Sequence, residues 1–104
     1  MKIYISGAIT NNENYKKDFE KAESEVRGLG GIPYNPARIE LPLEADYEEY
    51  MKLCLDMIDM CGGIYMLKNW KESKGANREL GYALGRDKLV IYQNDTKGSK
   101  PCQE

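Results

Sequence analysis

The sequence has 104 residues, a net charge of −2 and no histidine. Its length predicts one domain with a single modest core, and its mix of 41% hydrophobic and 31% charged residues is typical of globular proteins. Without histidine, the chain holds no Ser-His-Asp or Cys-His catalytic set and no His-ligated zinc or iron site. Acid–base chemistry near neutral pH then falls to Asp, Glu, Cys, Tyr, Lys or the ligand itself. The small net charge gives no reason to expect a nucleic-acid polymer as partner.

The three cysteines, Cys54, Cys61 and Cys102, lack the spacing of a metal site. Cys54 and Cys61 lie seven residues apart in one predicted helix, so we expect them to be buried thiols of the core. We expect no metal and no cofactor. The sequence shows no signal region and no apolar run of about 18 residues, which predicts a reduced, cytoplasmic protein without membrane contact.

Apolar spacing predicts four strands that alternate with three helices. Short β-branched and aromatic runs indicate strands at 2–5, 31–34, 64–67 and 89–92, and the proline of the second run suits an edge strand. Apolar side chains three and four residues apart indicate helices at 11–29, 44–61 and 74–85. Residues 1–94 are predicted to form the domain, and residues 95–104 a flexible tail.

This alternation predicts an α/β protein, a small flavodoxin- or Rossmann-like three-layer fold. Right-handed crossovers then give a parallel sheet of about four strands with helices on both faces. Ligands of such sheets bind beyond the carboxyl ends of the strands. We therefore expect segments 6–10, 35–37 and 68–75 to border one cleft.

The segment Ser6-Gly7-Ala8-Ile9-Thr10 directly follows the first predicted strand. Its glycine and small residues let the backbone approach a ligand, and its hydroxyl groups can bond a sugar or a phosphate. It is neither a Walker-type loop nor a G-x-G-x-x-G fingerprint. The segment indicates either a ligand-binding turn or an ordinary connection between a strand and a helix.

Glu79 lies beside the apolar stripe of the third predicted helix, three residues after Ala76 and four before Ala83. Its neighbours one helical turn away, Gly75 and Ala83, offer no cation that would pair with a solvated glutamate. Small side chains around a carboxylate leave room for a ligand. We weigh a functional Glu79 against a glutamate on a solvated helix face.

Ser73 is predicted to begin the same helix. Exposed N–H groups, the helix dipole and the serine hydroxyl together favour an anion there, and a simple N-cap is the compatible alternative. Trp70 just before it either stacks on a flat ligand ring or covers the sheet.

Three segments appear in one order along the chain: 4–10, 35–37, and 64–84 with Trp70, Ser73, Gly75, Ala76 and Glu79. In this order the chain resembles the nucleoside 2-deoxyribosyltransferase-like superfamily, and is closest to a small phage-associated branch of it. The resemblance covers residues 2–92. Its most specific part is the run from Glu79 to Leu84 that follows Ser73-x-Gly75-Ala76.

The resemblance implies N-glycosidic chemistry. A glutamate at the position of Glu79 attacks the anomeric carbon of a (deoxy)ribosyl group, the base leaves, and water or a second base resolves the covalent intermediate. A serine at the position of Ser73 is similar to that of the superfamily's nucleoside-monophosphate hydrolases, where it helps hold the 5′-phosphate. The predicted ligand-binding residues are Tyr4, Ser6, Gly7, Ala8, Ile9, Asn35, Trp70, Ser73, Gly75 and Ala76.

The chain departs from the superfamily at two positions. Cys54 stands where an aspartate usually assists the departing base, and Gly62 where a second aspartate is usual. Asp56 and Asp59 project about 200° and 140° away from Cys54 around a helix, at about 100° per residue. Neither is an obvious substitute for the missing aspartate.

Three functions are compatible with these observations. The first is a nucleotide or nucleoside N-glycosidase or deoxyribosyltransferase-like enzyme with Glu79 as the nucleophile. The second is a non-catalytic nucleotide-binding protein that sequesters a nucleotide-derived signal, as in phage counter-defence. The third is a structural or interaction domain that retains only the fold. The resemblance further predicts a homodimer or larger homo-oligomer, in the bacterial host cytoplasm if the protein is phage-encoded.

Overall fold

Four parallel strands form one sheet in the order β2-β1-β3-β4. In the computed structural model, which describes residues 1–93, β1 (Lys2–Ser6) lies between β2 (Ile32–Tyr34) and β3 (Gly63–Met66), and β4 (Leu89–Tyr92) forms the other edge. The predicted edge position of the proline-containing strand is therefore confirmed. The predicted flexible tail, residues 95–104, lies outside the described residues.

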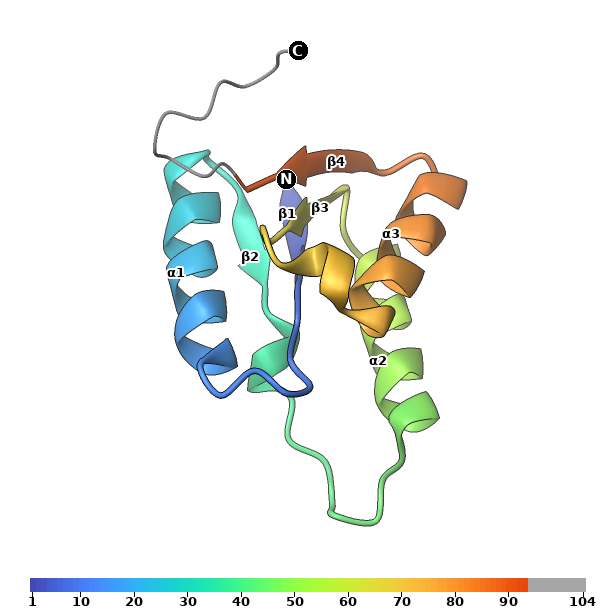
Figure 1. Cartoon of the computed structure of the whole chain (residues 1–104). Helices are drawn as coiled ribbons and strands as arrows, with labels where there is room; N and C mark the ends of the chain where they lie inside the picture. Colours follow the sequence, from blue (N-terminus) through green and yellow to red (C-terminus); the bar gives the residue numbers. More distant parts are fainter. Residues whose placement is uncertain (94–104) are drawn as a thin grey trace.

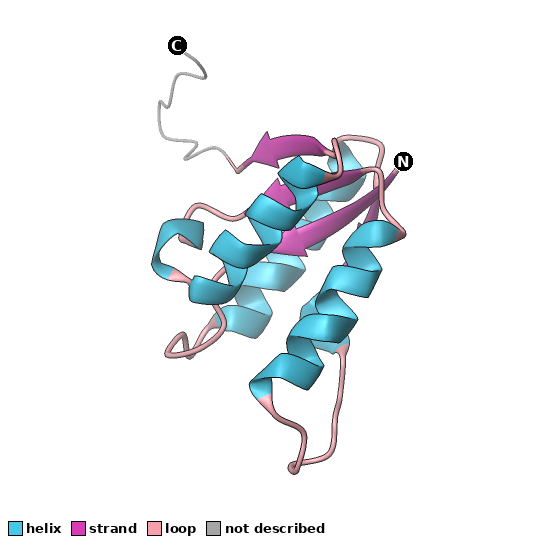
Figure 2. Cartoon of the chain, turned by 90° about the vertical axis from the view of Figure 1, so that its right-hand side faces the viewer, coloured by secondary structure: helices cyan, strands magenta, loops and turns pink. Residues whose placement is uncertain are grey.

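Helices cover both faces of the sheet, which confirms the predicted three-layer α/β fold. α1 (Tyr15–Gly28) packs on one face, and α2 (Tyr47–Asp59) and α3 (Lys74–Gly85) pack together on the other (Figures 1 and 2). Two short 3₁₀ helices, η1 (Pro36–Arg38) and η2 (Trp70–Glu72), lie in the segments that follow β2 and β3. Within residues 1–93, no helix is long and apolar enough to cross a membrane.

The first helix begins four residues later than the sequence predicts. Asn11 adopts a left-handed backbone with φ of 64°, and the Asn12 amide bonds the Ala8 carbonyl. These contacts hold residues 11–14 in turns, so α1 begins at Tyr15. The predicted apolar stripe is confirmed, because Phe19, Ala22 and Val26 are buried.

The second helix is shorter than predicted at both ends. Asp46 and Glu49 form a capping box in which each side chain bonds the other's backbone N–H, and this fixes the start of α2 at Tyr47. Glu44 therefore precedes the helix instead of belonging to its first turn. The helix ends at Asp59, so Cys61 lies in the connection to β3, buried as predicted for a core thiol.

Alternation along β1 sorts its side chains between the two faces of the sheet. Ile3 and Ile5 pack with α1, whereas Tyr4 joins the core beneath α2 and α3. Ser6, two residues after Tyr4, points to the same face as Tyr4, where its hydroxyl contacts Glu79 of α3. The strand therefore presents two hydroxyl groups to one helix.

Candidate active site

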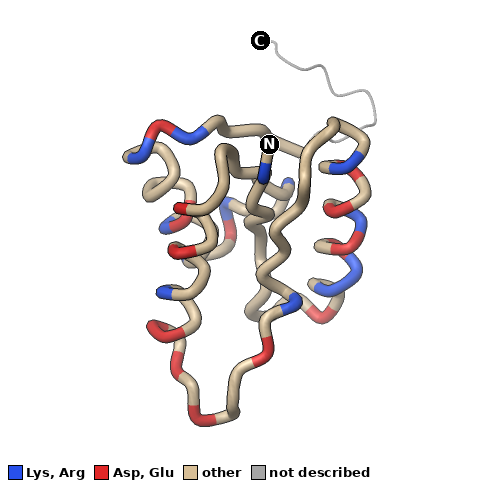
Figure 3. The backbone as a smooth tube through the Cα atoms, turned by 180° about the vertical axis from the view of Figure 1, so that it is seen from behind, with Lys and Arg blue, Asp and Glu red and all other residues tan. Residues whose placement is uncertain are grey.

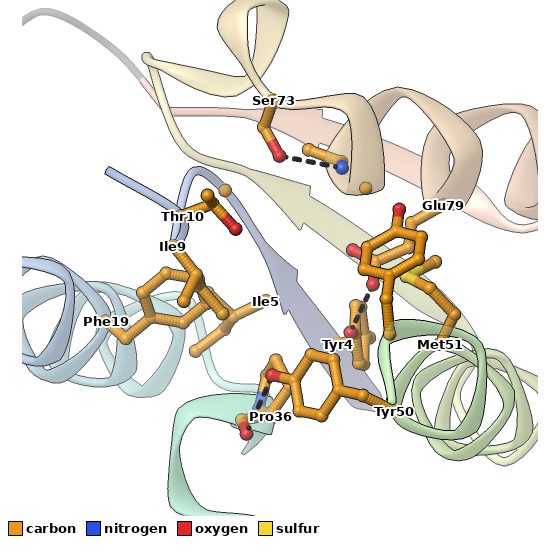
Figure 4. Close-up of a pocket in the computed structure, with 14 residues that line it drawn as sticks. Tyr4, Ile5, Ile9, Thr10, Phe19, Pro36, Tyr50, Met51, Ser73 and Glu79 are labelled. Carbon is orange, nitrogen blue, oxygen red and sulfur yellow. Dashed lines mark hydrogen bonds between the residues drawn. The ribbon is translucent and has the colours of Figure 1, made fainter. Parts of the chain in front are cut away.

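A cavity of about 280 Å³ opens beyond the carboxyl end of β1, between the β1–α1 loop, η1, α2 and the start of α3 (Figure 4). All three segments that were predicted to border one cleft contribute to it. The lining residues are Tyr4, Ile5, Gly7, Ile9, Thr10, Phe19, Pro36, Tyr47, Tyr50, Met51, Ser73, Gly75, Ala76 and Glu79.

Glu79 lies at the inner end of this cavity and is only 5% exposed. The Tyr4 phenol donates to its Oε2 at 2.8 Å, and the Ser6 hydroxyl donates to its Oε1 at 2.6 Å. Both carboxyl oxygens are thus held by hydroxyl groups of β1, which fixes the orientation of the carboxyl group. The distance of 2.6 Å is typical of a charge-assisted O–H···O⁻ bond.

Burial raises the pKa of Glu79 to about 7, and the hydrogen bonds from Ser6 and Tyr4 limit the rise. The carboxyl group therefore changes charge close to neutral pH. Perturbed carboxyl groups in cavities are typical of functional sites. The predicted alternative of a solvated glutamate is wrong, because the side chain is buried.

The other acids near Glu79 are weak. Burial and the Glu79 charge raise the pKa of the Cys54 thiol to about 12. Burial also raises the pKa values of the Tyr4 and Tyr50 phenols well above the ordinary range of tyrosine. Asp56 is exposed, and Asp59 is held on the surface by Tyr82 and Arg86. Neither aspartate reaches the cavity, as the helical geometry predicted.

The β1–α1 loop passes very close to β3. A Cβ atom on Gly7 would lie 2.6 Å from Cδ1 and 2.9 Å from Cβ of Leu67, so only glycine fits at this position. The backbone N–H of Ala8 donates to the Asn69 side chain at 3.1 Å, which ties the loop to the segment after β3. Ala8 thus holds the loop and is not among the lining residues.

The amino end of α3 forms another wall of the cavity. The Ser73 hydroxyl accepts from the Ala76 N–H at 3.0 Å, which confirms the predicted N-cap. Gly75 faces the side chains of Met51 and Tyr47, which lie 3.5 Å from the position that a Cβ atom would occupy.

Three other predicted ligand-binding residues lie outside the cavity wall. Ser6 is fully buried, with its hydroxyl group on Glu79. Asn35 caps η1 by accepting from the Ala37 N–H and donates to Glu23. Trp70 packs against Tyr92, with ring centroids 6.0 Å apart, and so covers the end of the sheet, as in the alternative weighed for it.

The sequence analysis missed the α2 side of the cavity. Tyr47, Tyr50 and Met51 line it, and the Tyr50 phenol donates to the Pro36 carbonyl at 3.2 Å. In the sequence, Tyr47 and Met51 fit the apolar spacing of the helix predicted at 44–61, and this spacing does not distinguish them from core residues. Their position, at the start of the helix that follows a predicted cleft segment, was the available signal.

No group of three or more His, Cys, Asp or Glu side chains within residues 1–93 is arranged to hold a metal ion. The cavity wall in this part of the chain contains one carboxylate and several hydroxyl groups. Such groups can form hydrogen bonds with a polar ligand.

Comparison with known proteins places the chain in a family. Residues 1–92 match the model of the family described as Domain of unknown function (DUF4406). The chain belongs to this family. A search of curated protein sequences finds no match to this DUF4406 chain.

Two solved structures share the fold of the DUF4406 chain. One is a 2-desoxiribosyltransferase from Leishmania mexicana, with a TM-score of 0.66 and 21% identity over 88% of this chain. The other is a 2-deoxyribosyltransferase from the psychrotolerant bacterium Bacillus psychrosaccharolyticus, with a TM-score of 0.68 and 24% identity over 88% of this chain. The chain spans 62% and 71% of their respective lengths. The predicted nucleoside 2-deoxyribosyltransferase-like fold is confirmed, and the phage-associated branch stays a prediction.

Proposed function

We propose that this chain cleaves the bond between base and sugar in a nucleoside or nucleotide, with Glu79 as the nucleophile. The observation that supports the proposal best is the buried Glu79 carboxyl group, held by two hydroxyl groups at the inner end of a cavity. The fold shared with two deoxyribosyltransferases agrees with it.

In the proposed reaction, a carboxylate oxygen of Glu79 forms a bond to the anomeric carbon, and the C1′–N bond breaks with its electron pair going to the base. Tyr4 and Ser6 hold the carboxylate at one angle, which limits the motion lost on reaching the transition state. Water then adds at the anomeric carbon and releases Glu79, and its proton balances the charge on the departed base. A second base in place of water gives transfer.

The start of α3 is the proposed site for the 5′ end of the sugar. Gly75 and Ser73 line the cavity about one and nearly two helical turns before Glu79, so a sugar placed over Glu79 extends toward them. The Ser73 hydroxyl and the helix N-terminus offer hydrogen bonds to a 5′-hydroxyl or 5′-phosphate.

The properties of Cys54 favour a second candidate function, that of a nucleotide-binding protein without catalytic turnover. It is a fully buried thiol beside Glu79, and its raised pKa makes it a poor proton donor to a departing base. A pocket that keeps its nucleophile but lacks an acid is suited to holding a nucleotide-derived signal.

The experiment is an assay of free-base release from ribo- and 2′-deoxyribonucleosides and their 5′-monophosphates, followed by chromatography. We expect release that Glu79→Ala abolishes and that the exposed control Glu72→Ala retains. The intact mass of acid-quenched protein should show a glycosyl adduct that is absent from Glu79→Ala.

Other outcomes distinguish the alternatives. If calorimetry shows stoichiometric nucleotide binding and no base is released, the sequestering function is favoured over the enzymatic one. If the protein neither releases a base nor binds a nucleotide, the remaining function is that of a structural or interaction domain.

A further inference from the structure

Among the described residues that line the cavity, Glu79 is the proposed nucleophile and no second carboxyl group is present to protonate the leaving base. Besides Glu79, the titratable groups at or beside it are the Tyr4, Tyr47 and Tyr50 phenols and the Cys54 thiol. Cleavage of a neutral nucleoside leaves negative charge on the base, and a positioned acid normally relieves that charge. A base that leaves as a neutral molecule needs no acid.

The charge of the cavity also favours a positive ligand. Among the lining residues, all of which belong to the described part of the chain, Glu79 is the single side chain that carries a charge, and there is no Lys or Arg. Arg78 lies outside the wall, where it pairs with Glu48 at 3.1 Å and its guanidinium lies 5.7 Å from the centroid of the Tyr47 ring. Its positive charge acts on Glu79 and favours the ionised carboxylate. Acidic positions follow one another along the connection that leads into α2 (Figure 3), where the sequence has Glu44 and Asp46 before the helix begins at Tyr47.

Aromatic and apolar groups form the remaining wall. Phe19 and Tyr50 line the cavity, together with Ile5, Ile9 and Met51 (Figure 4). Tyr47 also lines it, but its ring already faces the Arg78 guanidinium. The faces of phenyl and phenol rings attract a flat cation, with an interaction that strengthens when water is excluded.

We propose that the site takes nucleosides whose base already carries a positive charge, namely an N-alkylated purine or an N-linked pyridinium ring. This inference rests on the proposed function for its chemistry. In the reaction, Glu79 bonds to the anomeric carbon and the C1′–N electron pair neutralises the ring, so the base leaves uncharged without receiving a proton. Water then replaces Glu79 at the anomeric carbon and gives its second proton to solvent.

Binding of a cationic ring would also activate the nucleophile. A positive charge next to a carboxyl group favours its ionised form. The proton of Glu79 is then released as the ligand binds, and the charged nucleophile appears only in the presence of the substrate that it attacks. Proton release on binding is a readout that does not depend on turnover.

The test compares 7-methylguanosine with guanosine, which differ by one methyl group and one positive charge. We expect kcat/KM for release of 7-methylguanine to exceed that for guanine by at least about 100-fold, the lower limit of what one acid contributes. The ratio should be at least as large as that of the uncatalysed rates. Equal kcat/KM values for the two nucleosides would overturn the inference while the proposed function stands.

A variant with an added acid gives an independent arm. Cys54→Asp should raise release of guanine relative to release of 7-methylguanine by about 10-fold or more, whereas Cys54→Ser should leave the ratio of the two rates unchanged. An equal gain for both nucleosides would contradict the inference. If Cys54→Asp does not fold, the comparison in the unmodified chain still decides.

Binding separates this inference from the proposed function. Calorimetry at pH 6.5 in two buffers of different ionisation enthalpy should show tighter binding of 7-methylguanosine than of guanosine, with proton release that Glu79→Gln abolishes. Preferential binding without release of either base would refute the proposed function alone. Equal binding of the two nucleosides together with no release would refute both.

Discussion

The Tyr4 phenol donates a 2.8 Å hydrogen bond to Oε2 of Glu79, joining residues 75 positions apart in the sequence. This bond favours the charged carboxylate, so Tyr4→Phe should raise the pKa of Glu79 further. The rise of kcat/KM with pH would then move to higher pH. Tyr65→Phe is the matched control, because Tyr65 bonds Glu25 on the opposite face of the sheet. An unmoved pH profile in Tyr4→Phe would contradict the prediction.

Glu79 should make the protein less stable as the pH rises. Its folded-state pKa of about 7 lies above the ordinary value, so the folded state holds the proton more tightly than the unfolded state. The stabilisation by this proton is fully present below about pH 4.5 and is lost as the pH rises through about 7. It amounts to about 3 kcal/mol at most.

Glu79→Gln should therefore gain stability over the unmodified chain between pH 5 and pH 8. Urea unfolding at the two pH values measures the change, and Glu72→Gln on the exposed surface of η2 should show no such trend. A constant difference between Glu79→Gln and the unmodified chain at both pH values would refute the assigned pKa direction.

Gly7→Ala should destabilise the protein by about 1–3 kcal/mol, because the added Cβ atom overlaps the Leu67 side chain. Gly81→Ala, in the interior of α3 with no atom within 4 Å of the new Cβ, should stabilise it by about 0.5–1 kcal/mol. Thermal unfolding of both variants tests the pair. The two changes in stability should have opposite signs. Loss of stability in both variants would contradict the explanation that Gly7→Ala acts through overlap with Leu67.

Ser73→Ala should lose about 1 kcal/mol of stability, because the Ala76 N–H loses its acceptor. We also expect weaker binding of nucleoside 5′-monophosphates. Asp46→Ala removes the corresponding cap of α2 and should reduce stability by a similar amount without changing ligand binding. Equal effects of the two variants on binding would restrict Ser73 to a capping role.

The sheet, the helix order and the position of Glu79 followed from local patterns. Period-2 and period-3.6 apolar spacing depends on neighbouring residues, and it predicted all four strands and three helices. The helix ends at Tyr15 and Tyr47 could not be placed as well, since they depend on turn and cap contacts such as the Asp46–Glu49 pair.

The cavity was predicted only in part because its walls come from distant segments. Ser73, Gly75 and Glu79 follow from one helix and its cap, whereas Tyr50 reaches the site through a bond to Pro36 of η1. Trp70 packs on Tyr92, and no local pattern pairs those two rings. The homo-oligomer and the cytoplasmic location stay predictions.

The hydrogen bonds of Glu79 join the first strand of the sheet to its last helix, across 73 and 75 positions. Contacts that close such long loops form slowly, because the chain must lose much conformational freedom before they are made. During synthesis, Tyr4 and Ser6 leave the ribosome long before Glu79, so their hydrogen bonds to it cannot form until later. A nascent chain therefore cannot engage a ligand through this carboxylate until α3 has emerged and docked on the sheet.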